Sequence, residues 1–363
     1  MPEQCTFYKA AVITRSNKES RFEVKTLPLP ELGPTDVLVK LSISGVCGTD
    51  FALASGELGP TCSILGHEGV GRVVKLGSAL VETNIRLGQR VGVTWIRDIC
   101  GECSMCLHDG GETRCAEQVH SGRKVNGTFA EYTVVPQRYL LKIPEDLTDE
   151  EVAPILCGGV TSYKALKTCG AVPGQWIAIS GAGGGVGALG VMYAKAMGFR
   201  VIAIDAGVAK RQCCLELGAE LYFDVVKEQN LLASVKKVAD GKGAAAVLVA
   251  AGNIAAYQSA MGLLGPFGTL VCVGIPPPPQ TFGISPIVMI DNGFRIIGSA
   301  VGTRGDILEA IDFVRRKVVR PAVMTARLED LNGIAGLTKS GKVLGKYVIT
   351  LGDDRKDSDQ ARV

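Results

Sequence analysis

The sequence predicts an α/β protein in which a β-rich, barrel-like part is joined to a doubly wound parallel sheet. From about residue 158 to 301, apolar runs of strand length alternate with segments of helical periodicity, the pattern of a parallel sheet with helical crossovers. Residues 1 to about 156 instead carry short β-rich runs between Gly and Pro turns, which indicates a mostly antiparallel sheet. A chain of 363 residues is long enough to give each part its own core.

The expected elements follow in order along the chain. In the first part, the clearest strand signals are residues 9–13, 36–43 and 69–76. In the second part, strands are expected at 176–180, 200–205, 221–224, 245–250, 269–274 and 294–301, and helices near 186–197, 208–217, 228–239 and 253–264. A one-sided apolar pattern predicts a further helix over 306–317 and a strand over 346–351 that returns to the first part. The polar tail, residues 353–363, is expected to be disordered.

The composition narrows the classes of protein. The chain is 47% hydrophobic and 21% charged, as in globular proteins, and its net charge of +3 comes without a basic cluster, which disfavours nucleic acid as a partner. The longest apolar run, residues 244–251, is too short to cross a membrane. Residues 1–5 show no targeting signal, so a cytoplasmic location is expected.

A glycine-rich turn, residues 180–187, follows the first strand of the second part and opens a helix. Glycines there permit a tight turn and let the backbone approach a pyrophosphate at the helix N-terminus. The pattern G-x-G-x-x-G is not matched literally, because Ala182 takes the first position and one glycine is extra. The next strand ends in Asp205, whose carboxylate suits a ribose diol and repels a 2′-phosphate. Together these features predict a dinucleotide site that prefers NAD.

Four of the twelve cysteines form a dense cluster, Cys100-x2-Cys103-x2-Cys106-x8-Cys115. Four thiolates at such spacing close a tetrahedral zinc site within one loop and leave no open position. Disulfides are rare in a reducing compartment, so metal is the better explanation. The sequence thus predicts a structural zinc lobe over residues 97–116.

Three other candidate ligands are dispersed. Cys47 lies in a Gly-rich segment, His67 precedes Glu68 in G-H-E-G-V-G, and Cys157 follows an apolar run. Spacing alone does not connect them, and a single cysteine or histidine is more often a core residue than a ligand.

Taken together, these motifs resemble those of the zinc-dependent medium-chain alcohol dehydrogenases, and among them the fungal tetrameric enzymes. The G-H-E-x-x-G segment, the four-cysteine lobe and the glycine turn occur in the order of that family, and the likeness continues to Gly345-Lys346-Tyr347-Val348. The resemblance implies a GroES-like catalytic domain at residues 1–157 and 302–363. It also implies a Rossmann NAD-binding domain at 158–301.

The resemblance assigns roles to the dispersed ligands. Cys47, His67 and Cys157 would bind a catalytic zinc, while Glu68 would sit behind the metal and exchange onto it. Asp50 would orient the His67 imidazole through its other ring nitrogen. Two zinc ions per chain are therefore expected. Zinc would act as a Lewis acid while a hydride passes between an alcohol or aldehyde and NAD(H).

Further positions match the cofactor site and the proton relay of the family. Thr49 corresponds to the hydroxyl that begins the relay. The expected cofactor-binding residues are Gly48, Thr161, Gly181, Gly183, Gly184, Gly185, Val186, Gly187, Asp205, Lys210, Gly274, Ile275 and Lys346. Two positions depart from the family: Gly48 replaces a common basic residue, and Ala52 replaces the histidine that often ends the relay. We therefore expect the proton to leave through water or the ribose hydroxyl, and Lys346 to compensate at the pyrophosphate.

The predicted substrate pocket is wider than that of ethanol-type enzymes. Besides Thr49, the expected pocket residues are Trp95, which keeps a bulky aromatic position just before the cysteine lobe, and Leu58 and Ala300, which replace larger aromatics. A substrate larger than ethanol follows from this pattern. Oligomerisation through the last strand of the parallel sheet, as a dimer or tetramer, is expected from the resemblance.

Three alternatives use the same or a similar fold. A zinc-free quinone or enoyl reductase would not need the seven cysteine and histidine ligands. A polyol dehydrogenase would need a more polar pocket, and a non-catalytic dinucleotide-binding protein would be expected to lose the open zinc site.

Overall fold

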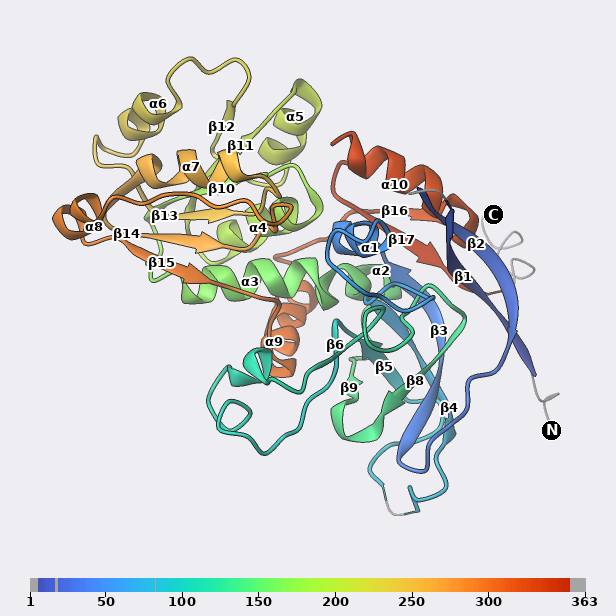
Figure 1. Ribbon diagram of the computed structural model, residues 1–363. Helices are drawn as coiled ribbons and strands as arrows, with labels where there is room; N and C mark the ends of the chain where they lie inside the picture. The colour runs from blue at the N-terminus through green and yellow to red at the C-terminus, as the bar shows by residue number, and fades with distance from the viewer. Residues whose placement is uncertain (1–5, 17–18, 82, 353–363) are drawn as a thin grey trace, which may run out of the picture.

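The computed structural model describes residues 6–16, 19–81 and 83–352, and its two large sheets lie on opposite sides of the molecule (Figure 1). Helix α3 (Gly158–Thr168) runs beside the six-stranded sheet toward the seven-stranded one. The polar tail, residues 353–363, and the first five residues lie outside the described part of the chain.

The six-stranded sheet is parallel throughout and has the order β12-β11-β10-β13-β14-β15. Its strands are β10 (Trp176–Ser180), β11 (Arg200–Asp205), β12 (Leu221–Asp224), β13 (Ala244–Val249), β14 (Leu264–Cys272) and β15 (Arg295–Gly298). If the six strands are renumbered 1 to 6 from β10 to β15, their order across the sheet is 3-2-1-4-5-6. This is the doubly wound arrangement of dinucleotide-binding folds. The predicted Rossmann sheet is thereby confirmed.

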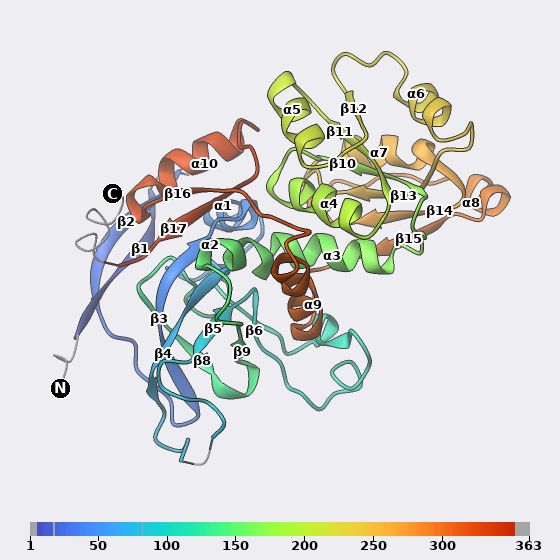
Figure 2. The same cartoon turned by 180° about the vertical axis from the view of Figure 1, so that it is seen from behind.

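Helices cover both faces of this sheet (Figure 2). They are α4 (Gly185–Ala196), α5 (Val208–Glu216), α6 (Leu231–Val238), α7 (Ile254–Leu263), α8 (Pro286–Asn292) and α9 (Arg304–Arg315), besides α3. Along β10, Ile177 and Ile179 pack with α3, α4 and α9, whereas Trp176 and Ala178 pack with α6 and α7. Side chains alternate across a strand, so a strand covered on both faces is apolar at every position.

The seven-stranded sheet is mostly antiparallel. Its strands are β3 (Asp36–Gly45), β4 (Gly69–Leu76), β5 (Arg90–Val93), β8 (Tyr132–Pro136), β9 (Leu141–Lys142), β16 (Val323–Ala326) and β17 (Lys346–Thr350). Strand β17 pairs antiparallel with β3 and parallel with β16. This pairing returns the end of the chain to the β-rich part.

The remaining elements are short or peripheral. They are β1 (Phe7–Ser16) paired with β2 (Glu19–Pro28), β6 (Ile96–Asp98) paired with β7 (Val119–His120), α1 (Gly48–Ala54), α2 (Asp149–Val152), α10 (Leu331–Lys339) and the 3-10 turns η1 (Gly111–Arg114), η2 (Gln137–Tyr139), η3 (Ala153–Leu156) and η4 (Leu328–Asp330).

Several boundaries differ from the sequence prediction. Helix α9 begins at Arg304 rather than at residue 306, because the Thr303 hydroxyl accepts the Asp306 N–H at 3.1 Å and the Asp306 carboxylate accepts the Thr303 N–H at 2.9 Å. Strand β15 covers only the first half of the strand expected at 294–301. Helices α3, α8 and α10 and strand β16 were not expected, since glycines or short length weaken their periodicity.

Candidate metal centres and cofactor cleft

Side chains from three separate segments meet in one cluster of possible metal ligands. One ligand atom from each of Cys47, His67, Glu68 and Cys157 lies within 4.8 Å of all the others. Cys47 precedes α1, His67 and Glu68 precede β4, and Cys157 separates η3 from α3. Two sulfurs, one imidazole and one carboxylate fit the donor set of a zinc site with an exchangeable fourth position.

Asp50 fixes the orientation of the His67 ring. Its Oδ1 lies 2.9 Å from His67 Nδ1 and accepts the Gly66 N–H at 3.1 Å, while its Oδ2 accepts the Cys47 N–H at 3.1 Å. The other ring nitrogen, Nε2, therefore points to Cys157 Sγ, 3.3 Å away. Burial lowers the pKa of His67, but the Asp50 carboxylate and, after it, Cys47 outweigh burial and hold the pKa well above its ordinary value.

Glu68 is fully buried beside this cluster and forms an ion pair with Lys346, Nζ to Oε1 2.5 Å. Its second oxygen, Oε2, has no hydrogen-bond partner within the described part of the chain. A Cβ on Gly45 would lie 2.0 Å from that oxygen, so Gly45 is needed for the carboxylate to fit. Burial raises the pKa of Glu68 to about 7 against the opposing effect of Lys346. A buried oxygen without a partner next to thiols and imidazole suits a metal-exchange role.

The two sulfurs of the cluster are in contact. The hydrogen bond from Cys157 lowers the pKa of Cys47 well below its ordinary value, and the same contact raises the pKa of Cys157. Thiolate is the form that binds zinc.

The four cysteines of the predicted lobe also converge. Their sulfurs lie within 4.8 Å of one another, with Cys100 Sγ 3.7 Å from Cys106 Sγ and 3.6 Å from Cys115 Sγ. Backbone N–H groups of Glu102 and Cys103 lower the pKa of Cys100 to about 7. Four sulfurs form a closed ligand set, which fits a structural rather than a catalytic zinc.

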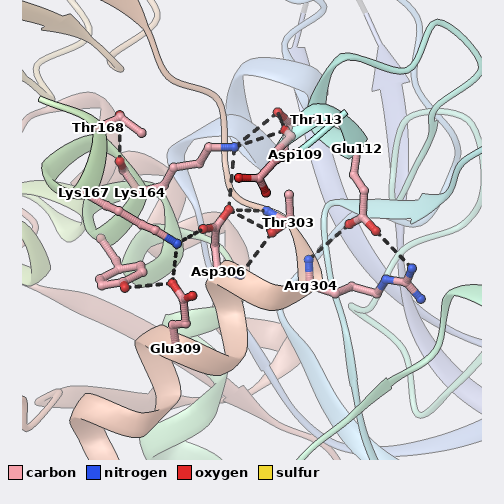
Figure 3. Close-up of polar contacts among 12 residues, drawn as sticks. Asp109, Glu112, Thr113, Lys164, Lys167, Thr168, Thr303, Arg304, Asp306 and Glu309 are labelled. Carbon is pink, nitrogen blue, oxygen red and sulfur yellow. Dashed lines mark hydrogen bonds and ion pairs between the residues drawn. The ribbon is translucent and has the colours of Figure 1, made fainter. Parts of the chain in front are cut away.

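Polar contacts hold this lobe against α3 and α9 (Figure 3). Glu112 Oε1 pairs with Arg304 at 3.0 Å, and Lys164 Nζ lies 3.5 Å from Thr113 Oγ1 and 3.6 Å from Asp306 Oδ2. Because α3 starts directly after Cys157, the lobe and one ligand of the other cluster are supported by the same helix.

A cleft of about 230 Å³ is lined both by Cys47 of the cysteine–histidine cluster and by the glycine turn. It is lined by Val46, Cys47, Gly48, Phe51, Gly181, Gly184, Gly185, Val186, Gly187, Lys210, Ala250, Ile334, Thr338, Gly341, Val343, Gly345, Lys346 and Tyr347. Phe51 and Tyr347 were not expected here, because α1 and the returning strand β17 bring them to the cleft through long-range packing.

The glycine turn is tight enough to require glycine. A Cβ on Gly187 would lie 2.1 Å from the Gly181 carbonyl oxygen, and Gly181 has a φ of +80°. The Asp205 carboxylate accepts the Gly183 N–H at 2.9 Å and pairs with Lys210 at 2.8 Å. The turn and the acid at the end of β11 thus form one hydrogen-bonded unit, and in dinucleotide-binding folds an acid at this place binds the ribose hydroxyl.

The remaining expected cofactor residues lie on adjoining elements. Thr161 is buried in the first turn of α3 and donates its N–H to the Cys157 carbonyl at 2.9 Å. Gly274 follows β14, where a Cβ would meet Ala251 O at 2.3 Å, and Ile275 is 59% exposed. The Lys346 ammonium, expected at a pyrophosphate, contacts Glu68 instead, while its stem lines the cleft.

The expected pocket residues are less closely grouped. Thr49 Oγ1 lies 3.6 Å from Cys47 Sγ, and the Trp95 ring meets the His67 ring edge-on at 5.2 Å. Leu58 is half-buried against the core of the β-rich part, and Ala300 is exposed. His120, not predicted, stacks on Trp95 at 4.7 Å.

The fold and the two ligand clusters define the class of zinc-type medium-chain dehydrogenases. The family described as "Alcohol dehydrogenase GroES-like domain" matches residues 33–145, and "Zinc-binding dehydrogenase" matches 185–316. An alcohol dehydrogenase of Geobacillus stearothermophilus is 42% identical over 349 residues, which cover 95% of this chain and 100% of that protein. Alcohol dehydrogenase 1 of Emericella nidulans is 40% identical over 332 residues, which cover 90% of this chain and 93% of that protein.

Solved structures agree with the sequence relatives. Acetophenone reductase from Geotrichum candidum NBRC 4597, in complex with NAD, has a TM-score of 0.84 at 27% identity and covers 97% of this chain and 99% of its own. The alcohol dehydrogenase from Aeropyrum pernix has a TM-score of 0.83 at 29% identity. The match covers 94% of this chain and 99% of that protein. The chain therefore belongs to the zinc-type alcohol dehydrogenase family, and it is an enzyme with alcohol dehydrogenase activity. No helix in its described part has the length and apolar content to cross a bilayer.

Proposed function

We propose that this enzyme transfers a hydride between NAD(H) and an alcohol or carbonyl substrate bulkier than ethanol, with two zinc ions per chain. The observation that carries this proposal is the cleft that Cys47 and the glycine turn line together. Hydride transfer needs the reacting carbon and the nicotinamide in contact, and a shared cleft supports this. Asp205 and the NAD bound to the acetophenone reductase support NAD as the cofactor.

The roles of the ligand residues follow from their contacts. Cys47, His67 and Cys157 would hold the catalytic zinc, with Glu68 as the exchangeable ligand, and Cys100, Cys103, Cys106 and Cys115 would hold the structural zinc. When bound, the catalytic zinc supplies the Lewis acidity that favours loss of the alcohol proton. Asp50 keeps a proton on Nδ1 of His67, so that Nε2 is presented to the metal.

Thr49 is the residue that we propose to receive the substrate proton. Its hydroxyl is half-buried beside Cys47 and can pass a proton outward. Because Ala52 has no titratable group, the route continues through water or the ribose hydroxyl. We assign residues 1–157 and 302–363 to the catalytic domain and 158–301 to the cofactor-binding domain.

The substrate class rests on the sequence, in which Leu58 and Ala300 stand where ethanol-type enzymes carry larger aromatic residues while Trp95 keeps its aromatic ring. Assembly into a dimer or tetramer through β15 is supported by its position at the edge of the sheet and by Phe267 and Ile290, which are 77% and 74% exposed. We retain a cytoplasmic location as part of the proposal.

The decisive measurement is the initial rate of NADH oxidation with aldehydes graded from acetaldehyde to a branched aromatic aldehyde, with NADPH in parallel. Rates that rise with substrate bulk and depend on NADH support the proposal. Activity confined to acetaldehyde would contradict the wide pocket, and turnover only of activated alkenes would favour a reductase.

Metal content provides an independent test. Elemental analysis is expected to find two zinc ions per chain. The variant Cys103→Ser, which loses one ligand of the four-cysteine cluster, should retain about one zinc ion per chain. A native protein with one ion or none would contradict the assignment of the two clusters.

A further inference from the structure

A second cavity, of about 310 Å³, lies in the β-rich part and shares no lining residue with the cofactor cleft. Its walls are Tyr8, Pro30, Asp36, Ile64, Arg97, Asp98, Val119, Val125, Asn126, Gly127, Tyr132, Thr133, Val134 and Pro136. Most of these side chains are apolar or aromatic, and the Tyr8 and Tyr132 rings meet edge-on at 6.1 Å. The volume is at the lower end of the range of small-molecule sites.

The guanidinium of Arg97 lines this cavity while only 2% of the residue is exposed. Its hydrogen-bond partners are all neutral: Ser121 Oγ at 3.1 Å, Thr133 Oγ1 at 3.0 Å, Asn126 O at 3.2 Å and the Val134 carbonyl. These four acceptors leave one of its five N–H groups without a partner in the described chain. No described carboxylate lies within 4.0 Å of it, and burial lowers the pKa of Arg97 to about 10. A buried charge without a counter-ion is costly, which is unusual for a purely structural residue.

A second donor faces the same cavity. Tyr8 is 6% exposed, and its hydroxyl makes no hydrogen bond with the described residues, although its ring is packed. Asp98 does not neutralise Arg97, because Arg138 already binds its two oxygens at 2.9 and 2.7 Å. Asp36 also lines the cavity, without an ion pair in the described chain, and its charge opposes an anion.

We propose that this cavity binds a small monocarboxylate with an apolar body, whose carboxylate meets Arg97 and the Tyr8 hydroxyl. One positive charge without an ion-pair partner and two available donors match a single carboxylate better than a dianion, and the apolar walls match a hydrocarbon or aromatic body. The site is separate from the redox centre and does not depend on the substrate proposed above.

The cavity is joined to the catalytic cluster through Ser121 and Trp95. Ser121, which accepts from Arg97, donates its N–H to the Trp95 carbonyl at 2.9 Å and its hydroxyl to the Thr94 carbonyl at 2.6 Å. Trp95 in turn contacts the His67 ring. Occupancy of the cavity is therefore expected to change the fluorescence of Trp95.

The test is calorimetric titration of the holoenzyme with benzoate and, as a neutral isostere, benzamide. One benzoate per chain is expected, with at least tenfold weaker binding of benzamide. Arg97→Gln should weaken benzoate about tenfold or more, and Tyr8→Phe severalfold. Asp36→Asn should tighten it, whereas Arg72→Gln, which removes an equal charge from a solvent-exposed pair with Glu145, should leave it unchanged.

Equal binding of benzamide, or benzoate affinity unchanged in both Tyr8→Phe and Asp36→Asn, would overturn the proposal. These two substitutions preserve side-chain size, so they decide the question even where Arg97→Gln does not fold. Benzoate that is displaced by the alcohol substrate would also overturn it, because binding would then lie in the catalytic cleft.

Discussion

The ammonium of Lys346 lies 2.5 Å from Oε1 of Glu68, although 278 residues separate the two in sequence. Lys346 is 5% exposed and Glu68 is fully buried, so neither charge has much access to water. Burial lowers the pKa of Lys346, but the Glu68 carboxylate outweighs this effect and raises it. The pair ties β17 to the loop that carries His67, and it places a compensated charge behind the cysteine–histidine cluster.

Substitution Lys346→Gln should destabilise the fold, because it leaves the buried Glu68 carboxylate without its partner. Loss of one member of a buried pair costs about 3–5 kcal/mol, measurable as the free energy of unfolding in urea. The double variant Lys346→Gln, Glu68→Gln should recover much of that loss. If stability were unchanged while NADH affinity fell, the pyrophosphate role expected from the sequence would be the better assignment.

Asp306 of α9 pairs with lysines of α3, and we expect these contacts to make the stability of the fold depend on pH. Burial raises the pKa of Asp306, but its bonds to Thr303 and its pairs with Lys167 and Lys164 outweigh burial and hold the pKa below its ordinary value. A depressed pKa contributes stability above the unfolded value, near 4, and this contribution disappears as the pH falls through the folded pKa.

Asp306→Asn should therefore lower the free energy of unfolding by roughly 1–3 kcal/mol at pH 7. The difference from the native enzyme should persist to about pH 5 and shrink below about pH 4. Urea unfolding of both proteins across this range measures it. A difference that is the same at every pH would show that the loss comes from the N-terminal cap of α9 rather than from the charge.

The parallel sheet could be predicted from the sequence because apolar strands and amphipathic helices alternate in that part of the chain. Strands β11 and β12 begin and end at their predicted residues. The candidate metal ligands within one loop could also be predicted from the sequence, because the spacing from Cys100 to Cys115 is typical of a zinc lobe. The other candidate ligands lie in three separate segments, at Cys47, His67 and Cys157. No spacing rule connects these segments, so only the family resemblance predicted that the three residues form one site. The contacts of Lys346, Arg97 and His120 depend on strand pairing between distant residues, and no local pattern encodes them.

Gly48 offers a test of the cofactor cleft. A Cβ at this position meets no atom within 4 Å, and the residue lines the cleft together with Gly184 and Gly185. An arginine should therefore fit and provide a charged contact to the cofactor phosphates. Gly48→Arg should tighten NADH binding about fivefold to tenfold, as measured by fluorescence titration. Gly48→Ala is the control for backbone effects, and equal affinity of the two variants would contradict the placement of the pyrophosphate.

Cofactor choice is expected to depend on Asp205, whose carboxylate accepts three hydrogen bonds. One carboxylate oxygen accepts the Gly183 N–H, and the other accepts both the Ala206 N–H at 2.8 Å and the Lys210 ammonium at 2.8 Å. The carboxylate thus repels a 2′-phosphate. It also pairs with the Lys210 ammonium, which could otherwise bind such a phosphate.

Asp205→Gly should release the Lys210 ammonium and remove the repulsion. We expect kcat/KM with NADPH to rise about tenfold or more and kcat/KM with NADH to fall by a similar factor, since a ribose contact is lost. The variant Asp205→Gly, Lys210→Met should lose most of the gain with NADPH, because the freed ammonium is its physical source. A native enzyme that already prefers NADPH would contradict the role of Asp205, whereas a gain that survives Lys210→Met would assign the effect to lost repulsion alone.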